Sequence, residues 1–390
     1  MAPSESSGAH SHHPGVLAAL DPHAALVQAE AAVSETLFST QALSLPEGLG
    51  SAEQASTAAS AVRDAAALAR QGKRAGVVIM PGELLSALDA IAETAASRAS
   101  ILVHISAGSQ STRVPRNRDG GGASLGRTEI AAALDVGAGL LVSWSAQDAI
   151  DLTLIARRAA EDSETPFLHL LDPAEASGAG SVLLPSRKLC EKFLGPHAAP
   201  TIAADLSAVA IKRAERGFAS RVPFALGSAM RELGDLTGRT LGPIERHEMH
   251  DAEEIVVAIG SAFGPALAAG RALRADGKKV GVIGLRSLRP FFGAEVVKAI
   301  GRGKVIVVVE PIDVALAPCG PTAAAIKAAF ADALTWAPGF PGVGRIPPVV
   351  SVVFATVDGA ISEQQVKDAL TEIGAGDRAR RLIVFGSDAP

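Results

Sequence analysis

The chain has 390 residues, of which 48% are hydrophobic and 20% are charged, so it carries enough apolar material for two or three domains with cores. Its formal charge of -5 at pH 7 and its scattered basic residues exclude the clustered positive surface that nucleic acids and anionic membranes attract. Only Cys190 and Cys319 are present, and their separation excludes iron–sulfur and zinc motifs built by this chain.

The N-terminal segment gives no sign of a membrane span or a targeting signal. No apolar stretch reaches the ~18 residues that cross a bilayer, and no Lys or Arg precedes Arg63. We therefore expect a cytoplasmic protein. Residues 1–60 are expected to be a disordered tail and a linker helix, with the helix over 22–38. The tail contains His10, His12 and His13, which we interpret as solvated rather than as a metal site.

From residue 61 the sequence alternates between helical and strand patterns. Strands are predicted over 76–80, 101–105, 139–144 and 166–172, and helices over 61–70, 83–96, from 128, and over 146–160. This alternation predicts a parallel sheet with crossover helices, and the domain is expected to span 61–240 with a helical joint at its end. The long glycine-rich loop over 106–126 indicates either function or disorder.

A second α/β domain is predicted over 245–390. Its strands are uninterrupted Val- and Ile-rich runs over 254–260, 279–285, 304–310 and 349–355. Helices are predicted over 264–275, 293–300, 321–333 and 362–371. Strands that are apolar on both sides are typical of a parallel sheet covered by helices on both faces. The fold class is therefore α/β.

Two stretches resemble the pyruvate:ferredoxin oxidoreductase family. The first, over 127–172, has the family's acidic residue, glycine, serine, helix start and P-F-x-H-x-x-D strand; these positions are Glu129, Gly137, Ser143, Gln147, Asp151, Pro166, Phe167, His169 and Asp172. The second, over 237–291, carries a D-A-E strand at 251–261 and a K-V-G-V strand ending in R-P-F at 279–291. The resemblance implies a thiamine-enzyme pyrimidine-binding-like domain followed by a transketolase-C-terminal-like α/β domain.

The chain departs from this family where active members bind substrate and cofactor. Gly108 stands where the resemblance calls for the arginine that clamps the 2-oxoacid, and TLFSTQALSLPEG replaces the Y-P-I-T-P loop. Glu53 is the only candidate for the glutamate that hydrogen-bonds the thiamine pyrimidine, so it is the one cofactor-binding residue that we predict. No catalytic residue and no metal ligand is predicted.

With these departures the chain resembles an eroded form of the family, which is found at the N-terminus of fungal-type NADPH sulfite reductase flavoprotein subunits. The resemblance implies a module for assembly in sulfur assimilation that binds no cofactor itself, with FAD and NADPH bound only by downstream domains. It also implies a homodimer or a homologous reductase subunit as partner, packed through the helices at 128–135 and 146–160. The alternative is a thiamine-diphosphate-dependent 2-oxoacid:ferredoxin oxidoreductase alpha subunit, and a third class is an interaction protein outside redox metabolism.

Several other residues suggest sites but are better explained structurally. His247, Glu248 and His250 lack the four-residue histidine spacing of a helical zinc site, and we interpret them as an exposed loop. His104 and His169 lie in apolar strands and are expected in the core. Arg286 and Arg289 could bind a phosphate, but the family resemblance implies that they form ion pairs at the domain interface. The glycine-rich segments over 120–122 and 339–344 lack the context of a phosphate-binding loop.

Overall fold

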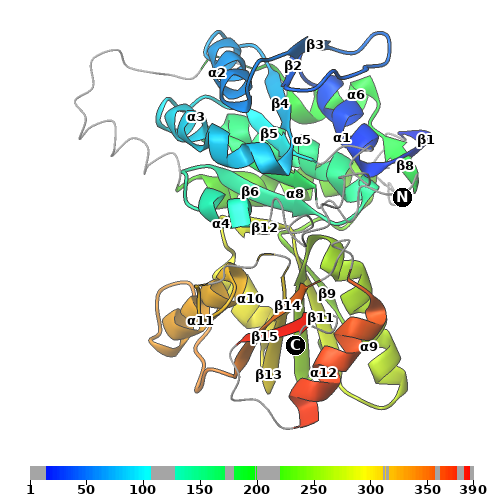
Figure 1. Ribbon diagram of the computed structural model, residues 1–390, viewed down its shortest axis with the longest axis vertical. Helices are drawn as coiled ribbons and strands as arrows, with labels where there is room; N and C mark the ends of the chain where they lie inside the picture. Colours follow the sequence, from blue (N-terminus) through cyan, green and yellow to red (C-terminus); the bar gives the residue numbers. More distant parts are fainter. Residues whose placement is uncertain are drawn as a thin grey trace, which may run out of the picture.

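The computed structural model describes residues 15–106, 128–171, 180–197, 199, 220–310, 312, 316–355, 361–375 and 382–386. Two α/β halves, each built around its own sheet, are stacked along the long axis of the molecule (Figure 1). Gly108, most of the loop over 106–126 and the tail histidines lie outside the described residues.

The first half is built on a seven-stranded sheet in the order β12-β6-β7-β5-β4-β2-β3. Its parallel strands are β2 (Thr36–Ser39), β3 (Ser51–Gln54), β4 (Ala75–Ile79), β5 (Leu102–Ile105), β6 (Gly139–Ser143) and β7 (Phe167–Leu171). The last strand, β12 (Ser287–Arg289), comes from the second half of the sequence and pairs antiparallel with β6. Backbone hydrogen bonds therefore join the two halves.

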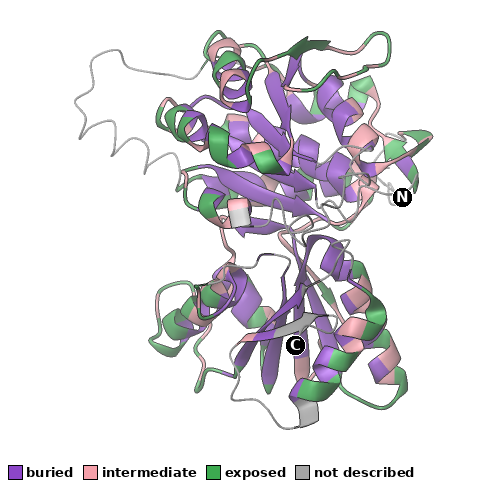
Figure 2. Cartoon of the chain, in the orientation of Figure 1, coloured by how far each residue is buried: buried purple, intermediate pink, exposed green. Residues whose placement is uncertain are grey.

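Helices cover both faces of this sheet. One face carries α2 (Ala58–Ala69), α3 (Leu84–Ala96) and α4 (Thr128–Ala133), and the other carries α1 (Pro22–Ala31), α5 (Ala146–Ser163), α6 (Arg187–Leu194) and α8 (Val222–Thr237). Within β5, Val103 and Ile105 pack in the core with α2 and α3, whereas Leu102 packs with α5. Except for the exposed edge strand β3, the strands are consequently largely buried, as Figure 2 shows, which explains their apolar sequences.

The structure corrects the expected linker in residues 15–60. The helix α1 ends at Ala31, and the next apolar residues form β2, buried between β3 and β4. A short apolar run fits a helix or a buried strand equally well, and here strand pairing decides. β3 forms in a Ser- and Ala-rich segment with all its residues exposed. A separate antiparallel ribbon joins β1 (Val16–Leu20) to β8 (Gly180–Leu184) and packs on α1 and α5.

The second half contains a six-stranded sheet in the order β15-β14-β13-β10-β11-β9. Its strands are β9 (Ile244–His247), β10 (Glu254–Ile259), β11 (Val280–Leu285), β13 (Val305–Val309), β14 (Val349–Ala355) and β15 (Leu382–Gly386). All are parallel except β9, which is antiparallel to β11. The four predicted Val- and Ile-rich strands and the α/β class are confirmed. β9 was not predicted, and it takes His247 out of the expected loop.

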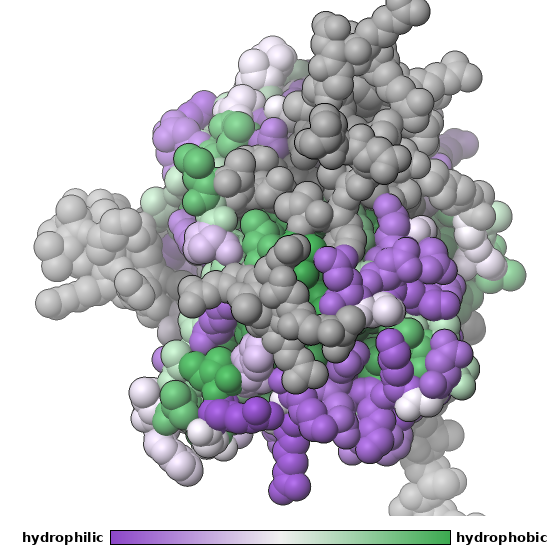
Figure 3. Space-filling model, turned by 60° about the horizontal axis from the view of Figure 1, so that its bottom comes forward, coloured by the Kyte–Doolittle hydropathy of each residue, from purple (hydrophilic) through white to green (hydrophobic). Residues whose placement is uncertain are grey.

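Four helices sandwich the second sheet, with α9 (Phe263–Ala275) and α12 (Glu363–Ala375) on one face and α10 (Gly293–Ile300) and α11 (Pro321–Leu334) on the other. Hydrophilic side chains cover much of the surface that Figure 3 brings forward. Among the described helices, none is both long and apolar enough to cross a bilayer.

A buried ion pair ties α1 to α5 inside the first half. The side chains of Glu30 and Arg157 are both 0% exposed, and the Arg157 guanidinium donates to the Glu30 carboxylate. Arg157 also donates to the backbone carbonyls of Ser100 and Ala75, and Ser34 Oγ donates to Glu30 Oε1 at 2.5 Å. Burial alone raises the pKa of Glu30, but the Arg157 charge and the hydrogen bonds outweigh it and lower the pKa to about 2.

The two predicted core histidines complete this cluster, and both are fully buried. His104 Nε2 lies 3.2 Å from Glu30 Oε2, and His104 Nδ1 lies 3.2 Å from His169 Nδ1. Burial lowers the pKa of His169 well below its ordinary value. His169 therefore stays neutral, and the predicted core position of both histidines is confirmed, although His169 Nε2 has no hydrogen-bond partner.

Replacing Arg157 with Leu is expected to reduce the free energy of unfolding by about 3–5 kcal/mol, because Glu30 then remains buried without its cation. The double variant Glu30→Leu, Arg157→Leu should be less destabilised than the single variant, since no unpaired charge remains. Urea unfolding followed by circular dichroism at pH 7 measures both. Arg187→Leu is the control, because its ion pair with Glu191 is exposed and should contribute less than about 1 kcal/mol. An Arg157→Leu protein as stable as the parent would contradict this role.

Candidate functional site

The parallel strands of the first sheet end along one edge, where α/β folds usually place ligands. We use the name carboxyl edge for the part of this edge where β2, β3, β4 and β5 end. It consists of residues 40–42, 54–57, 80–83 and 106. Its described residues include one acid, Glu83, and no lysine or arginine. An anionic substrate would therefore find no cation among them.

Side chains at the carboxyl edge bond largely to one another. Glu83 Oε2 accepts from Thr40 Oγ1 at 2.9 Å and from the Met80 backbone N–H at 2.8 Å. Gln54 Nε2 donates to the Thr40 carbonyl at 3.1 Å, and Gln41 Nε2 lies 2.8 Å from Met80 Sδ. These contacts tie together the ends of β2, β3 and β4. The Glu83 carboxylate serves as the cap of a short 3-10 helix, η1 (Pro81–Glu83).

Glu53, the predicted cofactor-binding residue, lies on the outermost strand of the first sheet. It is exposed, and it pairs in register with Phe38 of β2. A carboxylate that activates the aminopyrimidine of thiamine works in a water-excluded site, because water otherwise competes for the hydrogen bond. The described residues of this chain do not provide such surroundings for Glu53. By themselves they do not fit the thiamine group.

A histidine and a serine meet at the same edge. His23 Nδ1, in the first turn of α1, lies 2.8 Å from Ser106 Oγ. Burial lowers the pKa of His23. The nearby Asp21 does not complete a catalytic triad, since its carboxylate accepts the Ala24 N–H at 2.9 Å as the N-cap of α1. The pair therefore stabilises the junction between α1 and β5.

Arg286, directly after β11, is the centre of the contact between the two halves. Its Nε donates to Asp148 Oδ1 and its Nη2 to Glu245 Oε2, both at 2.6 Å. Its Nη1 donates to the Gly242 carbonyl at 3.3 Å, and the guanidinium lies 4.0 Å from the centre of the Trp144 ring. The side chain is only 6% exposed. We call this group of five residues the joint.

Further ion pairs surround the joint. Arg239 makes a bidentate contact with Asp151 at 2.8 and 2.6 Å, and burial raises the pKa of Asp151 to about 6 despite that contact. Arg289 Nε donates to Asp135 Oδ1 at 2.9 Å at the exposed rim. The predicted ion-paired role of Arg286 and Arg289 at the domain interface is confirmed.

The helices that were expected to pack against a partner are largely buried in the core of this chain. In α5 thirteen of the eighteen residues are buried, because α1, α6 and α8 pack around it on the sheet. On α4, Ile130 and Ala133 are buried in the core with α3. The expectation that α5 offers an apolar face to a partner is wrong, since its apolar residues belong to the core of the first half.

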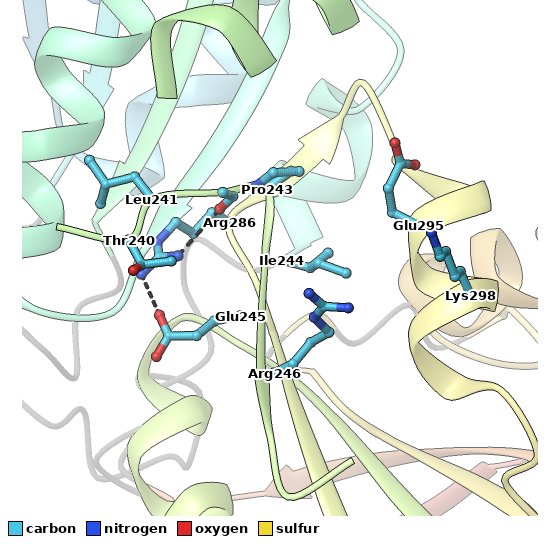
Figure 4. A pocket seen from close by; sticks show the side chains of 10 residues that line it. Thr240, Leu241, Pro243, Ile244, Glu245, Arg246, Arg286, Glu295 and Lys298 are labelled. Atoms are coloured by element: carbon cyan, nitrogen blue, oxygen red, sulfur yellow. Dashed lines mark hydrogen bonds and ion pairs between the residues drawn. The ribbon is translucent and has the colours of Figure 1, made fainter. Parts of the chain in front are cut away.

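A cavity of about 480 Å³ lies beside the joint, between the segment that connects the two halves and helix α10 (Figure 4). Residues 240–246, Arg286, Glu295 and Lys298 line it. Sequence reasoning missed this place, because Arg246 and Lys298 are far apart in sequence and belong to no motif. Within the described residues, no group of three or more His, Cys, Asp or Glu side chains is arranged to hold a metal ion.

Two family models match the chain in the order of its two halves. "Pyruvate flavodoxin/ferredoxin oxidoreductase, thiamine diP-bdg" matches residues 82–224, and "Pyruvate:ferredoxin oxidoreductase core domain II" matches residues 252–340. Together they support the pyruvate:ferredoxin oxidoreductase family for this chain.

Curated relatives point to the same family. A putative pyruvate-flavodoxin oxidoreductase of Synechocystis is 28% identical over 200 residues, which is 45% of this chain and 16% of the relative. The pyruvate-flavodoxin oxidoreductase of Rhodospirillum rubrum is 27% identical over 42% of this chain and 15% of its own length. The pyruvate synthase subunit PorA of Methanothermobacter thermautotrophicus is 34% identical over 21% of each chain. This chain thus spans about a sixth of the first two relatives.

Solved structures confirm the predicted arrangement of the fold. The 2-oxoglutarate:ferredoxin oxidoreductase of Magnetococcus marinus aligns with a TM-score of 0.62 at 15% identity, covering 91% of this chain and 65% of the other. A split-gene transketolase aligns with a TM-score of 0.57 at 14% identity, covering 93% and 100%. The two halves therefore have the fold of a pyrimidine-binding-like domain and a transketolase-C-terminal-like domain.

Replacing Arg286 with Leu is expected to destabilise the protein by about 3–5 kcal/mol, since Asp148 and Glu245 would lose their shared cation. With the joint weakened, we expect calorimetry to show two separate thermal transitions where the parent shows one. Arg289→Leu is the matched control, because its partner Asp135 is 83% exposed and the pair should contribute less than about 1 kcal/mol. One unshifted transition in Arg286→Leu would show that the joint does not hold the halves together.

Proposed function

We propose that this chain is an assembly module of an electron-transfer oxidoreductase, derived from the pyruvate:ferredoxin oxidoreductase domains and without chemistry of its own. More specifically, we propose that it corresponds to the N-terminal part of the flavoprotein subunit of assimilatory NADPH sulfite reductase, which takes part in reducing sulfite to sulfide. FAD and NADPH would then be bound by further domains of a longer polypeptide.

The described part of the carboxyl edge of the first sheet carries this proposal. Glu83 is committed to Thr40 and Met80, no described residue of the edge is basic, and Glu53 is exposed on the outer strand. An enzyme that binds an anionic 2-oxoacid needs a cation and a sheltered carboxylate there. In contrast, the joint and the buried ion pair of Glu30 are fully built, as a structural role requires.

Sequence features favour the sulfite reductase assignment within the family. Gly108 occupies the position of the substrate-clamping arginine, and the segment over 36–48 replaces the Y-P-I-T-P loop. In the structure part of that segment is β2, whose four residues are buried in the sheet. The replacement is therefore a folded element of the domain.

The second candidate is a thiamine-diphosphate-dependent alpha subunit of a 2-oxoacid:ferredoxin oxidoreductase. It is favoured by the family model over 82–224, whose description names thiamine diphosphate binding, and by the pyruvate synthase and pyruvate-flavodoxin oxidoreductase relatives. In that case a second chain would have to cover the exposed Glu53 and complete the site.

We propose a homodimer or a complex with a homologous reductase subunit as the assembled form. Multi-angle light scattering at micromolar concentration, with the chain alone and mixed with the partner sulfite reductase subunit, tests this. The expected result is a mass above 39.6 kDa in at least one sample, because obligate interfaces bury roughly 2,000 Å² or more and persist on dilution. The partner alone and an unrelated protein of similar size are the controls. A monomer of 39.6 kDa in both samples would remove the assembly proposal.

A further inference from the structure

The cavity beside the joint has an excess of positive charge. Three cations line it, Arg246, Arg286 and Lys298, against two carboxylates, Glu245 and Glu295, which gives a net charge of +1. The Arg286 guanidinium is already bonded to Asp148, Glu245 and the Gly242 carbonyl, so all of its nitrogens are in use. The charged side chains that remain for a ligand are Arg246, Lys298 and Glu295, which together carry a net charge of +1.

These two cations approach the cavity from opposite walls. Residues alternate along β9, so Ile244 and Arg246 lie on the side of α10, whereas His247 lies on the other side, 5.8 Å from the Phe263 ring. Glu295 and Lys298 are three residues apart on α10 and therefore share one helix face. Figure 4 shows Arg246 on the β9 side of the cavity and Lys298 on the α10 side.

Arg246 and Lys298 form no ion pair with the described residues. Within the described part of the chain, no carboxylate lies within 4.0 Å of the side-chain nitrogens of Arg246 or Lys298. The other arginine of the neighbourhood, Arg239, is paired bidentately with Asp151. Both side chains are exposed, and a bound oxyanion would attract each of them.

The wall also has apolar residues, since Leu241, Pro243 and Ile244 line the cavity. A pocket that combines a few polar groups with apolar residues suits a small organic molecule with one charged group. We propose that this cavity binds a small organic oxyanion, a carboxylate or a phosphate monoester with a short apolar body. The oxyanion lies between Arg246, which presents a bidentate fork, and Lys298.

Trp144 provides a direct reporter of this binding. It stacks on Arg286, which lines the cavity, and the only other tryptophan, Trp336, is 76% exposed. In a Trp336→Phe background, the emission of Trp144 is measured during titration with butyrate and, separately, with inorganic phosphate at constant ionic strength. The expected result is a saturable change with a dissociation constant on the order of 1 mM for at least one anion, and the tighter anion identifies the ligand class.

Variants decide whether the response arises in the cavity. Arg246→Gln and Lys298→Gln should each weaken binding about 10-fold, and Arg246→Lys should have a smaller effect because it keeps the charge but not the fork. Arg271→Gln and Lys278→Gln are the matched controls, because both are exposed cations of the same half, outside the cavity, and should leave binding unchanged. The substituted residues are exposed, and thermal melts verify folding. The proposal is overturned by a flat titration up to about 50 mM, an equal response to chloride, or unchanged binding in the Arg246→Gln, Lys298→Gln double variant.

Discussion

The arrangement of the two halves depends on one buried guanidinium. Arg286 belongs to the second half by sequence, yet it bonds to Asp148 at the start of α5 and stacks on Trp144 at the end of β6. Directly after it, β12 joins the sheet of the first half. The ion pair of Arg286 and the backbone pairing of β12 with β6 therefore connect the two halves at adjacent positions. A charge buried between domains is tolerated only with its partners in position, which fixes the orientation of the halves.

The polar side chains inside the first half are also largely bonded to one another. Glu30, Arg157, His104 and Ser34 form a buried hydrogen-bonded cluster, in which Arg157 Nε has no partner, and Glu83 bonds to Thr40 and to the Met80 N–H at the carboxyl edge. In an active site some polar groups are free to bond to a substrate, whereas most of these groups bond to other residues of the chain. The unpaired cations of the described cavity lie instead beside the joint, where the two halves meet.

Sequence patterns predicted the helices and strands that can be recognised from their own residues. The Val- and Ile-rich strands and their crossover helices could be read directly, because a buried parallel strand needs an apolar run. The ion-paired role of Arg286 came from the family resemblance. Seven strands of at most five residues were missed, since they form only through pairing with strands elsewhere in the chain: β1, β2, β3, β8, β9, β12 and β15. The same holds for the cavity: Arg246 and Lys298 meet only because β9 packs against α10. The apolar character of α5 was read correctly, but sequence could not say that α8 of the same chain covers it.

We propose that the first half of this chain is a structural unit whose carboxyl edge does not bind the pyrimidine of thiamine diphosphate. Isothermal titration of the purified chain with thiamine diphosphate and magnesium tests it most directly, because it measures binding without requiring a partner's electron acceptor. The account predicts no heat of binding. A one-site isotherm with a sub-micromolar dissociation constant would contradict it and would favour the thiamine-dependent alpha subunit.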